Sequence, residues 1–155
     1  MRNNHITWFG RYEGYLRTIA RGVRDNNPKC IECAAKLFDL MLPYGAKVVP
    51  MPGHFGTPVQ MLSVARQLKK RRNDILVVNF LRCDPHESNY SQKKRTTPAP
   101  IKMFFDDEEL CGECVNRGAD MFVIDNVICT GVTASAALQV LPDATVVALA
   151  MSSWR

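Results

Sequence analysis

The sequence lacks any long apolar run, because its apolar stretches are soon broken by Asp, Lys or Pro. A membrane-spanning helix needs roughly 20 consecutive, mostly apolar residues. The chain also lacks the basic start and apolar stretch of a signal peptide, and it has neither internal repeats nor low-complexity tracts. We therefore expect a soluble, cytoplasmic protein without a membrane partner, folded as a single domain over residues 1–155.

Acidic residues are fewer than basic ones, and the formal net charge is +5. This charge suits an anionic small-molecule ligand, and equally a weak affinity for nucleic acid. Arg17, Arg21 and Arg24 would form one helical stripe, which is either a solvated face or a contact for nucleic acid or protein. With 46% hydrophobic and 23% charged residues, the chain can bury a core, and extensive disorder is excluded.

Apolar periodicity predicts alternating helices and strands. Helices are expected over residues 10–23 (within an N-terminal helical hood segment, 1–27), from Pro28 to Pro43, and over 59–70 and 133–141. Strands are expected over residues 47–50, 75–81, 121–124 and 145–151, with a further short one over 103–105, and residues 84–100 read as a flexible loop. Alternation of this kind predicts an α/β fold with a central, mostly parallel sheet flanked by helices.

One strand is followed by residues that suit phosphate binding. After the apolar residues 121–124 come Asp125 and Asn126, then a loop and an Ala-rich helix. Backbone N–H groups of a Gly-containing loop and the N-terminus of a helix attract anions. The expected phosphate loop consists of Cys129, Thr130, Gly131, Val132 and Thr133. The alternative is a plain strand–turn–helix connection capped by Thr133.

The segment FVIDNVICTGVTASAA resembles the 5-phosphoribosyl-1-pyrophosphate (PRPP) signature of type I phosphoribosyltransferases. In that family two adjacent acids bind the ribose hydroxyls, and a TTGxT loop binds the 5-phosphate. The resemblance therefore assigns Asp125 and Asn126 to the ribose and residues 129–133 to the phosphate. Asn126 stands where the family has its second acid, and it lacks the negative charge that would stabilise a cationic ribosyl centre.

Earlier segments narrow the resemblance to ComF-like phosphoribosyltransferases, here without the N-terminal zinc ribbon. GRYEGYLR at residues 10–17, VVPMPGH at 48–54 and Leu81-Arg82 followed by Ser91-Gln92 are similar to stretches of that family in the same order. The loop after the first strand is shorter than in the family. The resemblance implies a type I phosphoribosyltransferase fold and, since dimers are common there, a homodimer.

The implied reaction is displacement of pyrophosphate from the ribose C1 carbon by an unidentified nucleobase or amine. Mg²⁺ would bridge the pyrophosphate and ribose oxygens, with Asp125 as an indirect ligand. Arg82 is the expected pyrophosphate contact, and a lid is expected to bring Lys93, Lys94 and Arg95, whose alternative is a solvated basic loop. His54 either faces the same cleft or is an ordinary exposed histidine. The second hypothesis is a PRPP-binding regulatory protein without efficient catalysis, linked to DNA uptake or processing.

Two CxxC pairs, Cys30/Cys33 and Cys111/Cys114, have the spacing of zinc half-sites. The separation between the pairs is far longer than in a zinc ribbon, so a Zn²⁺ site would have to assemble across the fold. The alternative is a set of small, buried, reduced thiols.

Overall fold

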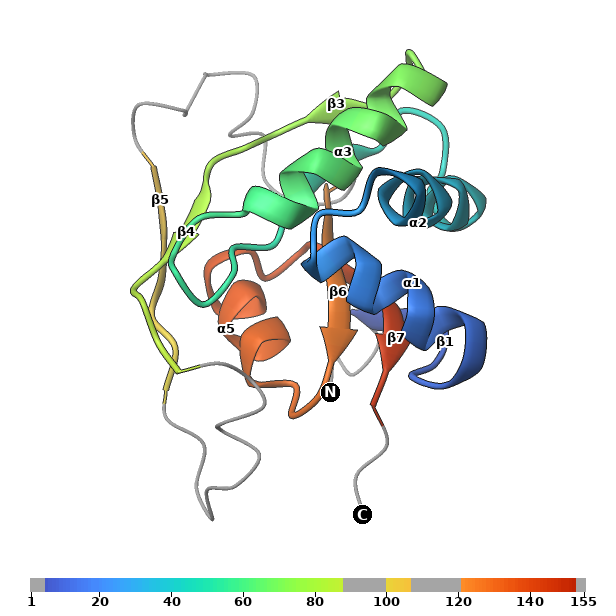
Figure 1. The fold of residues 1–155 in the computed structure, drawn as a ribbon. Coiled ribbons are helices and arrows are strands. Elements are labelled where there is room, and N and C mark those ends of the chain that lie inside the picture. Colours follow the sequence, from blue (N-terminus) through green and yellow to red (C-terminus); the bar gives the residue numbers. More distant parts are fainter. Residues whose placement is uncertain (1–4, 88–99, 107–120, 153–155) are drawn as a thin grey trace.

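The computed structural model describes residues 5–87, 100–106 and 121–152. Within these residues, five strands form the main sheet (Figure 1). They are β1 (Ile6–Arg11), β2 (Lys47–Pro50), β3 (Leu76–Val77), β6 (Met121–Ile128) and β7 (Thr145–Met151). Their order across the sheet is β1-β7-β6-β2-β3, and every neighbouring pair is parallel.

Helices cover both faces of this sheet. On one face, α1 (Gly14–Arg24), α2 (Pro28–Met41) and α3 (Val59–Arg71) pack against one another and against the strands. A further helix, α5 (Val132–Val140), contacts β6 and β7. The chain moves from β2 through α3 to β3 in one direction, and from β6 through α5 to β7 in the other. Because such crossovers are right-handed, α5 lies on the opposite face from α3.

Burial follows from this double cover. In β7, the five residues from Val146 to Ala150 are all buried, and in β2 both Val48 and Val49 are fully buried. Parallel strands between two helical layers need apolar residues on both faces, which explains the continuous apolar runs in the sequence. The predicted single-domain α/β fold with a mostly parallel sheet is confirmed, and this arrangement is consistent with a type I phosphoribosyltransferase-like fold.

The strand predicted over residues 75–81 is two strands. β3 pairs with β2, whereas β4 (Leu81–Cys83) leaves the main sheet and pairs antiparallel with β5 (Met103–Phe105). Asn79, which has a low strand propensity, lies at the break. The β4–β5 ribbon lies beside α5, with which β5 is in contact (Figure 1).

The N-terminal segment differs from the prediction. The helix expected from residue 10 begins at Gly14, and residues 6–11 form β1, an edge strand paired with β7. The described part of the expected hood segment 1–27 is therefore a strand and a helix of the main fold. The strand was missed because its residues are mostly exposed, as expected at a sheet edge, and show no apolar alternation.

The neighbouring strands β2 and β6 mark the point where the direction of the connections reverses. From β2 the chain continues to one side of the sheet, and from β6 to the other. In open α/β sheets, ligands bind beyond the carboxyl ends of the strands at such a switch point.

No helix in the described ranges is long and apolar enough to cross a membrane.

Candidate functional site

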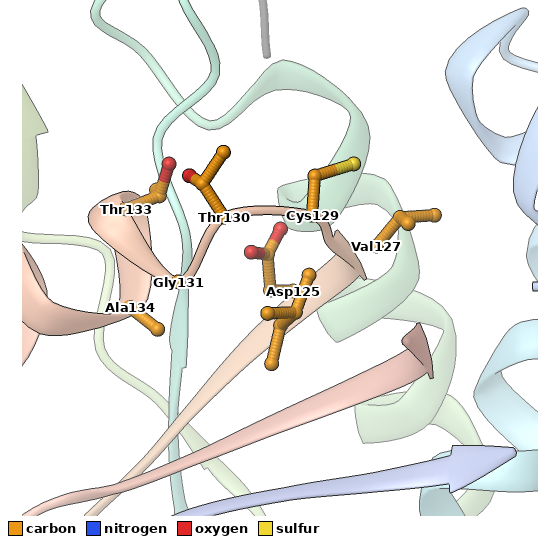
Figure 2. A pocket seen from close by; sticks show the side chains of 8 residues that line it. Asp125, Val127, Cys129, Thr130, Gly131, Thr133 and Ala134 are labelled. Carbon is orange, nitrogen blue, oxygen red and sulfur yellow. The ribbon is translucent and has the colours of Figure 1, made fainter. Parts of the chain in front are cut away.

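A small pocket lies where β6 passes into α5, at the carboxyl edge of the sheet (Figure 2). Gly131 adopts the left-handed conformation, with φ of 77°, which glycine reaches without the strain that a side chain would bring. The hydroxyl of Thr130 accepts a hydrogen bond from the backbone N–H of Val132 at 3.2 Å. The pocket is shallow and is lined by Asp125, Val127, Ile128, Cys129, Thr130, Gly131, Thr133 and Ala134.

The pocket presents hydrogen-bond donors suited to an anion. Gly131 is the N-cap residue of α5, which begins at Val132, and the positive end of the helix dipole faces the loop. The hydroxyls of Thr130 and Thr133 lie on the same side of the loop (Figure 2).

Asp125 contributes a carboxylate to the pocket. Its half-buried carboxylate points at the loop (Figure 2) and accepts a hydrogen bond from the backbone N–H of Asn126 at 2.7 Å. Burial raises the pKa of Asp125 to about 6, against the lowering effect of that hydrogen bond. A carboxylate held in this way accepts hydrogen bonds from hydroxyl groups of a ligand when it is ionised.

Asn126 lies on the other face of β6, because adjacent residues of a strand point to opposite faces. Its Nδ2 donates to the backbone carbonyl of Ala20 in α1 at 2.8 Å, and among the described residues its buried Oδ1 has no partner. Asn126 does not line the pocket. The side chains of Asp125 and Asn126 therefore lie on opposite faces of β6, although the resemblance assigns both to the ribose. The side chain of Asn126 instead connects β6 to α1.

Arg82 and His54 also lie apart from the loop pocket. Arg82, on β4, donates through Nη1 to Oδ1 of Asn79 at 3.1 Å, and its Nη2 lies 3.4 Å from Oδ2 of Asp106. His54 is exposed, and its ring packs against Phe55 with a centroid distance of 4.1 Å. The predicted lid residues Lys93, Lys94 and Arg95 lie outside the described residues.

The first CxxC pair lies near the start of α2. A Cβ on Gly22 would collide with Sγ of Cys30, so this thiol packs where α1 crosses α2. The hydroxyl of Tyr15 donates to Sγ of Cys33 at 3.7 Å, and this bond, followed by the charge of the thiols, raises the pKa of Tyr15. In the described ranges no group of three or more His, Cys, Asp or Glu side chains is suited to a metal ion. Cys111 and Cys114 lie outside these ranges, so the four-cysteine zinc site stays a prediction.

A larger groove beside the β4–β5 ribbon was missed in the sequence. Phe55, Phe104 and Asp106 line it together with Arg82. The signal was weak, since Phe104 belongs to a strand of only three residues and Phe55 to a loop. What marks them in the structure is the exposure of large aromatic rings, which is 80% for Phe55 and 42% for Phe104.

Comparisons with known proteins give no further identification: no family model matches the sequence, and a search of curated proteins finds no match.

Proposed function

We propose that the protein binds PRPP and transfers its 5-phosphoribosyl group to a nitrogen nucleophile with release of pyrophosphate. One observation carries the proposal. A carboxylate, two hydroxyls and a helix N-terminus meet in one pocket at the switch point of a parallel sheet. A ribosyl phosphate presents the matching groups, namely an anion to the loop and hydroxyls to the carboxylate.

Different residues of the pocket bind different parts of the ligand. The loop residues 129–133 and the first N–H groups of α5 bind the 5-phosphate, while Asp125 accepts hydrogen bonds from the ribose hydroxyls. Mg²⁺ is held in proteins by one or two carboxylates together with substrate phosphates and water, and the single carboxylate of Asp125 fits that donor set. When bound, the metal would neutralise charge on the pyrophosphate.

Transfer forms a bond from the nitrogen nucleophile to C1 of the ribose and breaks the bond from C1 to the pyrophosphate oxygen. The bond electrons leave with the pyrophosphate, and the nucleophile releases a proton. Charge at C1 becomes positive in the transition state, as in glycoside hydrolysis. The carboxylate of Asp125 stabilises that charge when ionised, which requires a pH above its raised pKa of about 6.

A second candidate function is PRPP binding without efficient transfer, in a regulatory protein linked to DNA uptake or processing. The observation that favours it is the position of Asn126, which donates to Ala20 and does not line the pocket. The ribose then meets one acid instead of two. Binding is retained in this candidate, whereas stabilisation of the cationic centre is weakened.

Calorimetry with PRPP and Mg²⁺, followed by pyrophosphate release over a panel of bases and amines, tests both candidates. Thr133→Val removes one hydroxyl and keeps the branched shape. Hydrogen bonds to charged groups contribute about 1.5–3 kcal/mol, so we expect binding to weaken about tenfold or more. The matched control is Thr18→Val on α1, where an exposed hydroxyl bonds only within its helix, to the carbonyl of Gly14.

Saturable binding with pyrophosphate release supports transfer, and equal binding without release supports the regulatory candidate. If the parent protein does not bind PRPP, or if Asp125→Ala and Thr133→Val bind it like the parent, the ligand assignment is wrong.

A further inference from the structure

Two thiols and a phenol meet where α1 packs against α2. These helices lie side by side (Figure 1), and Cys30 and Cys33 are half-buried near the start of α2. The hydroxyl of Tyr15, on α1, donates to Sγ of Cys33 at 3.7 Å. Because neither cysteine is fully enclosed, small molecules in solution can reach both thiols.

Both sulfurs lie near the same hydroxyl. The pKa of Tyr15 is raised first by the hydrogen bond to Cys33 and then by the charge of Cys33, with a smaller effect from the charge of Cys30. Residues three apart on a helix are neighbours, with Cβ atoms roughly 5–6 Å apart. A disulfide needs Cβ atoms roughly 3.5–4.5 Å apart. The two thiols can therefore join after a small tightening of the helix.

The first turn of α2 can tighten in this way. Asn27 is the N-cap residue, and its Oδ1 accepts the backbone N–H groups of Lys29 and Cys30 at 3.0 and 3.2 Å. The N–H of Cys30 is thus held by a side chain and not by the ladder of the helix. A short 3₁₀ turn, which is frequent at helix N-termini, places side chains three residues apart directly above each other. Such a turn would bring Cys30 toward Cys33.

The reduced form has contacts that a disulfide would remove. Sγ of Cys30 packs against Gly22 of α1, where an added Cβ would collide with it, and Sγ of Cys33 accepts the hydroxyl of Tyr15. Joining the two sulfurs draws both of them away from α1. Disulfides that strain their surroundings have higher reduction potentials and are the labile ones. The pair is therefore suited to reversible oxidation and not to a permanent crosslink.

We propose that Cys30 and Cys33 form a reversible dithiol–disulfide couple that exchanges with small-molecule disulfides of the glutathione class, and that Tyr15 stabilises its reduced form. The thiolate of one cysteine attacks a sulfur of the small disulfide, which releases one thiolate and leaves a mixed disulfide. The thiolate of the second cysteine then attacks the cysteine sulfur of that mixed disulfide and releases the second thiolate. Each cysteine gives up one proton, and the small disulfide is reduced to two thiols. This chemistry does not depend on PRPP binding.

Equilibration of the full chain in buffers of graded oxidised to reduced glutathione tests the couple. After denaturing quench and alkylation of the free thiols, trypsin releases one peptide, residues 30–36, that carries both Cys30 and Cys33 and no other cysteine. We expect mass spectrometry to show this peptide passing from the doubly alkylated form to the internal disulfide, which is two hydrogen atoms lighter than the dithiol. Cys83 is the internal control, because it is buried and burial raises its pKa to about 11. It should stay reduced at every ratio.

The role of Tyr15 has a matched pair of variants. Tyr15→Phe removes the hydroxyl and keeps the ring, so the exchange constant with glutathione should shift toward the disulfide by about two- to tenfold, the range for one net hydrogen bond. Tyr44→Phe makes the same change in a side chain that is 89% exposed, and it should leave the constant unchanged.

The proposal is overturned if peptide 30–36 stays reduced with oxidised glutathione in excess, or if it is recovered only as mixed disulfides with glutathione. A disulfide that forms only together with oxidation of Cys83 would also overturn it, because the reaction would then follow unfolding. Equal exchange constants in Tyr15→Phe and Tyr44→Phe would remove the stabilising role of Tyr15.

Discussion

Replacing Asp125 with asparagine tests whether the loop pocket keeps a carboxylate at a cost in stability. The pKa of Asp125 is raised from 3.8 to about 6, mainly by burial. A difference of one unit in pKa between the folded and unfolded states corresponds to about 1.4 kcal/mol. The ionised carboxylate therefore lowers the free energy of unfolding by about 3 kcal/mol. Asparagine has nearly the same shape, and its side-chain oxygen still accepts the N–H of Asn126, but it carries no charge.

The sign of the effect depends on pH. Below about pH 4, Asp125 is protonated in both states, and the variant should match the parent. Between pH 4 and 6 the unfolded chain ionises first, so the parent loses stability as the pH rises. Above pH 6 the difference is constant, and Asp125→Asn should be more stable by about 3 kcal/mol. For a chain of this size, that corresponds to a rise in Tm of roughly 6–12 °C.

Urea unfolding of the parent and the variant between pH 4 and 8 measures this difference. Asp74→Asn is a control of opposite sign. A hydrogen bond from Arg72, followed by one from the backbone N–H of Gly45, lowers the pKa of Asp74 to about 2. Its carboxylate therefore stabilises the fold at neutral pH, and the variant should be less stable there. A variant Asp125→Asn that is no more stable than the parent at pH 8, or whose gain in stability persists at pH 4, would contradict a destabilising buried carboxylate at this position.

Two further substitutions test the packing around α1. Gly22→Ala should destabilise the protein, because the new Cβ collides with Sγ of Cys30, and adding Cys30→Ala should recover part of the loss; additive losses in thermal unfolding would contradict the close contact. Asn126→Asp restores the acid pair of the motif but places a carboxylate against the carbonyl of Ala20, in place of a donor at 2.8 Å. It should cost about 1–3 kcal/mol at pH 8, and the cost should fall as the pH is lowered, because a protonated carboxyl can donate to that carbonyl. A variant as stable as the parent at pH 8 would argue against the link to α1.

The strands that lie buried between the two helical layers were predicted correctly from the sequence. β2 and β7 have the expected bounds, since both are buried between two layers and read as continuous apolar runs. β1 was missed because an edge strand shows no such run, and the strand over residues 75–81 was divided by the departure of β4 from the sheet. These failures share a cause, because which strand lies at an edge is decided by tertiary pairing and not by local pattern.

In the candidate site, too, the local features could be predicted from the sequence and the features that depend on tertiary structure could not. The loop residues 129–133 follow one another in the chain, and strand–loop–helix chemistry could be predicted from them directly. The separation of Asp125 from Asn126 depended on the length of β6. The strand was predicted to end at Ile124 and continues to Ile128, so both residues belong to a regular strand and alternate between its faces. The groove needed contacts between a loop and a ribbon that are distant in sequence, which no local motif encodes.

The most direct test of the central claim is the response of backbone amides to ribose 5-phosphate. In ¹⁵N-labelled protein, we predict that the largest saturable shifts lie at Gly131, Val132, Thr133 and Ala134, where the loop enters α5, and that Thr133→Val weakens them while Thr18→Val does not. Shifts confined to other regions, or none at millimolar ligand, would contradict the assignment of the loop pocket as the phosphate site.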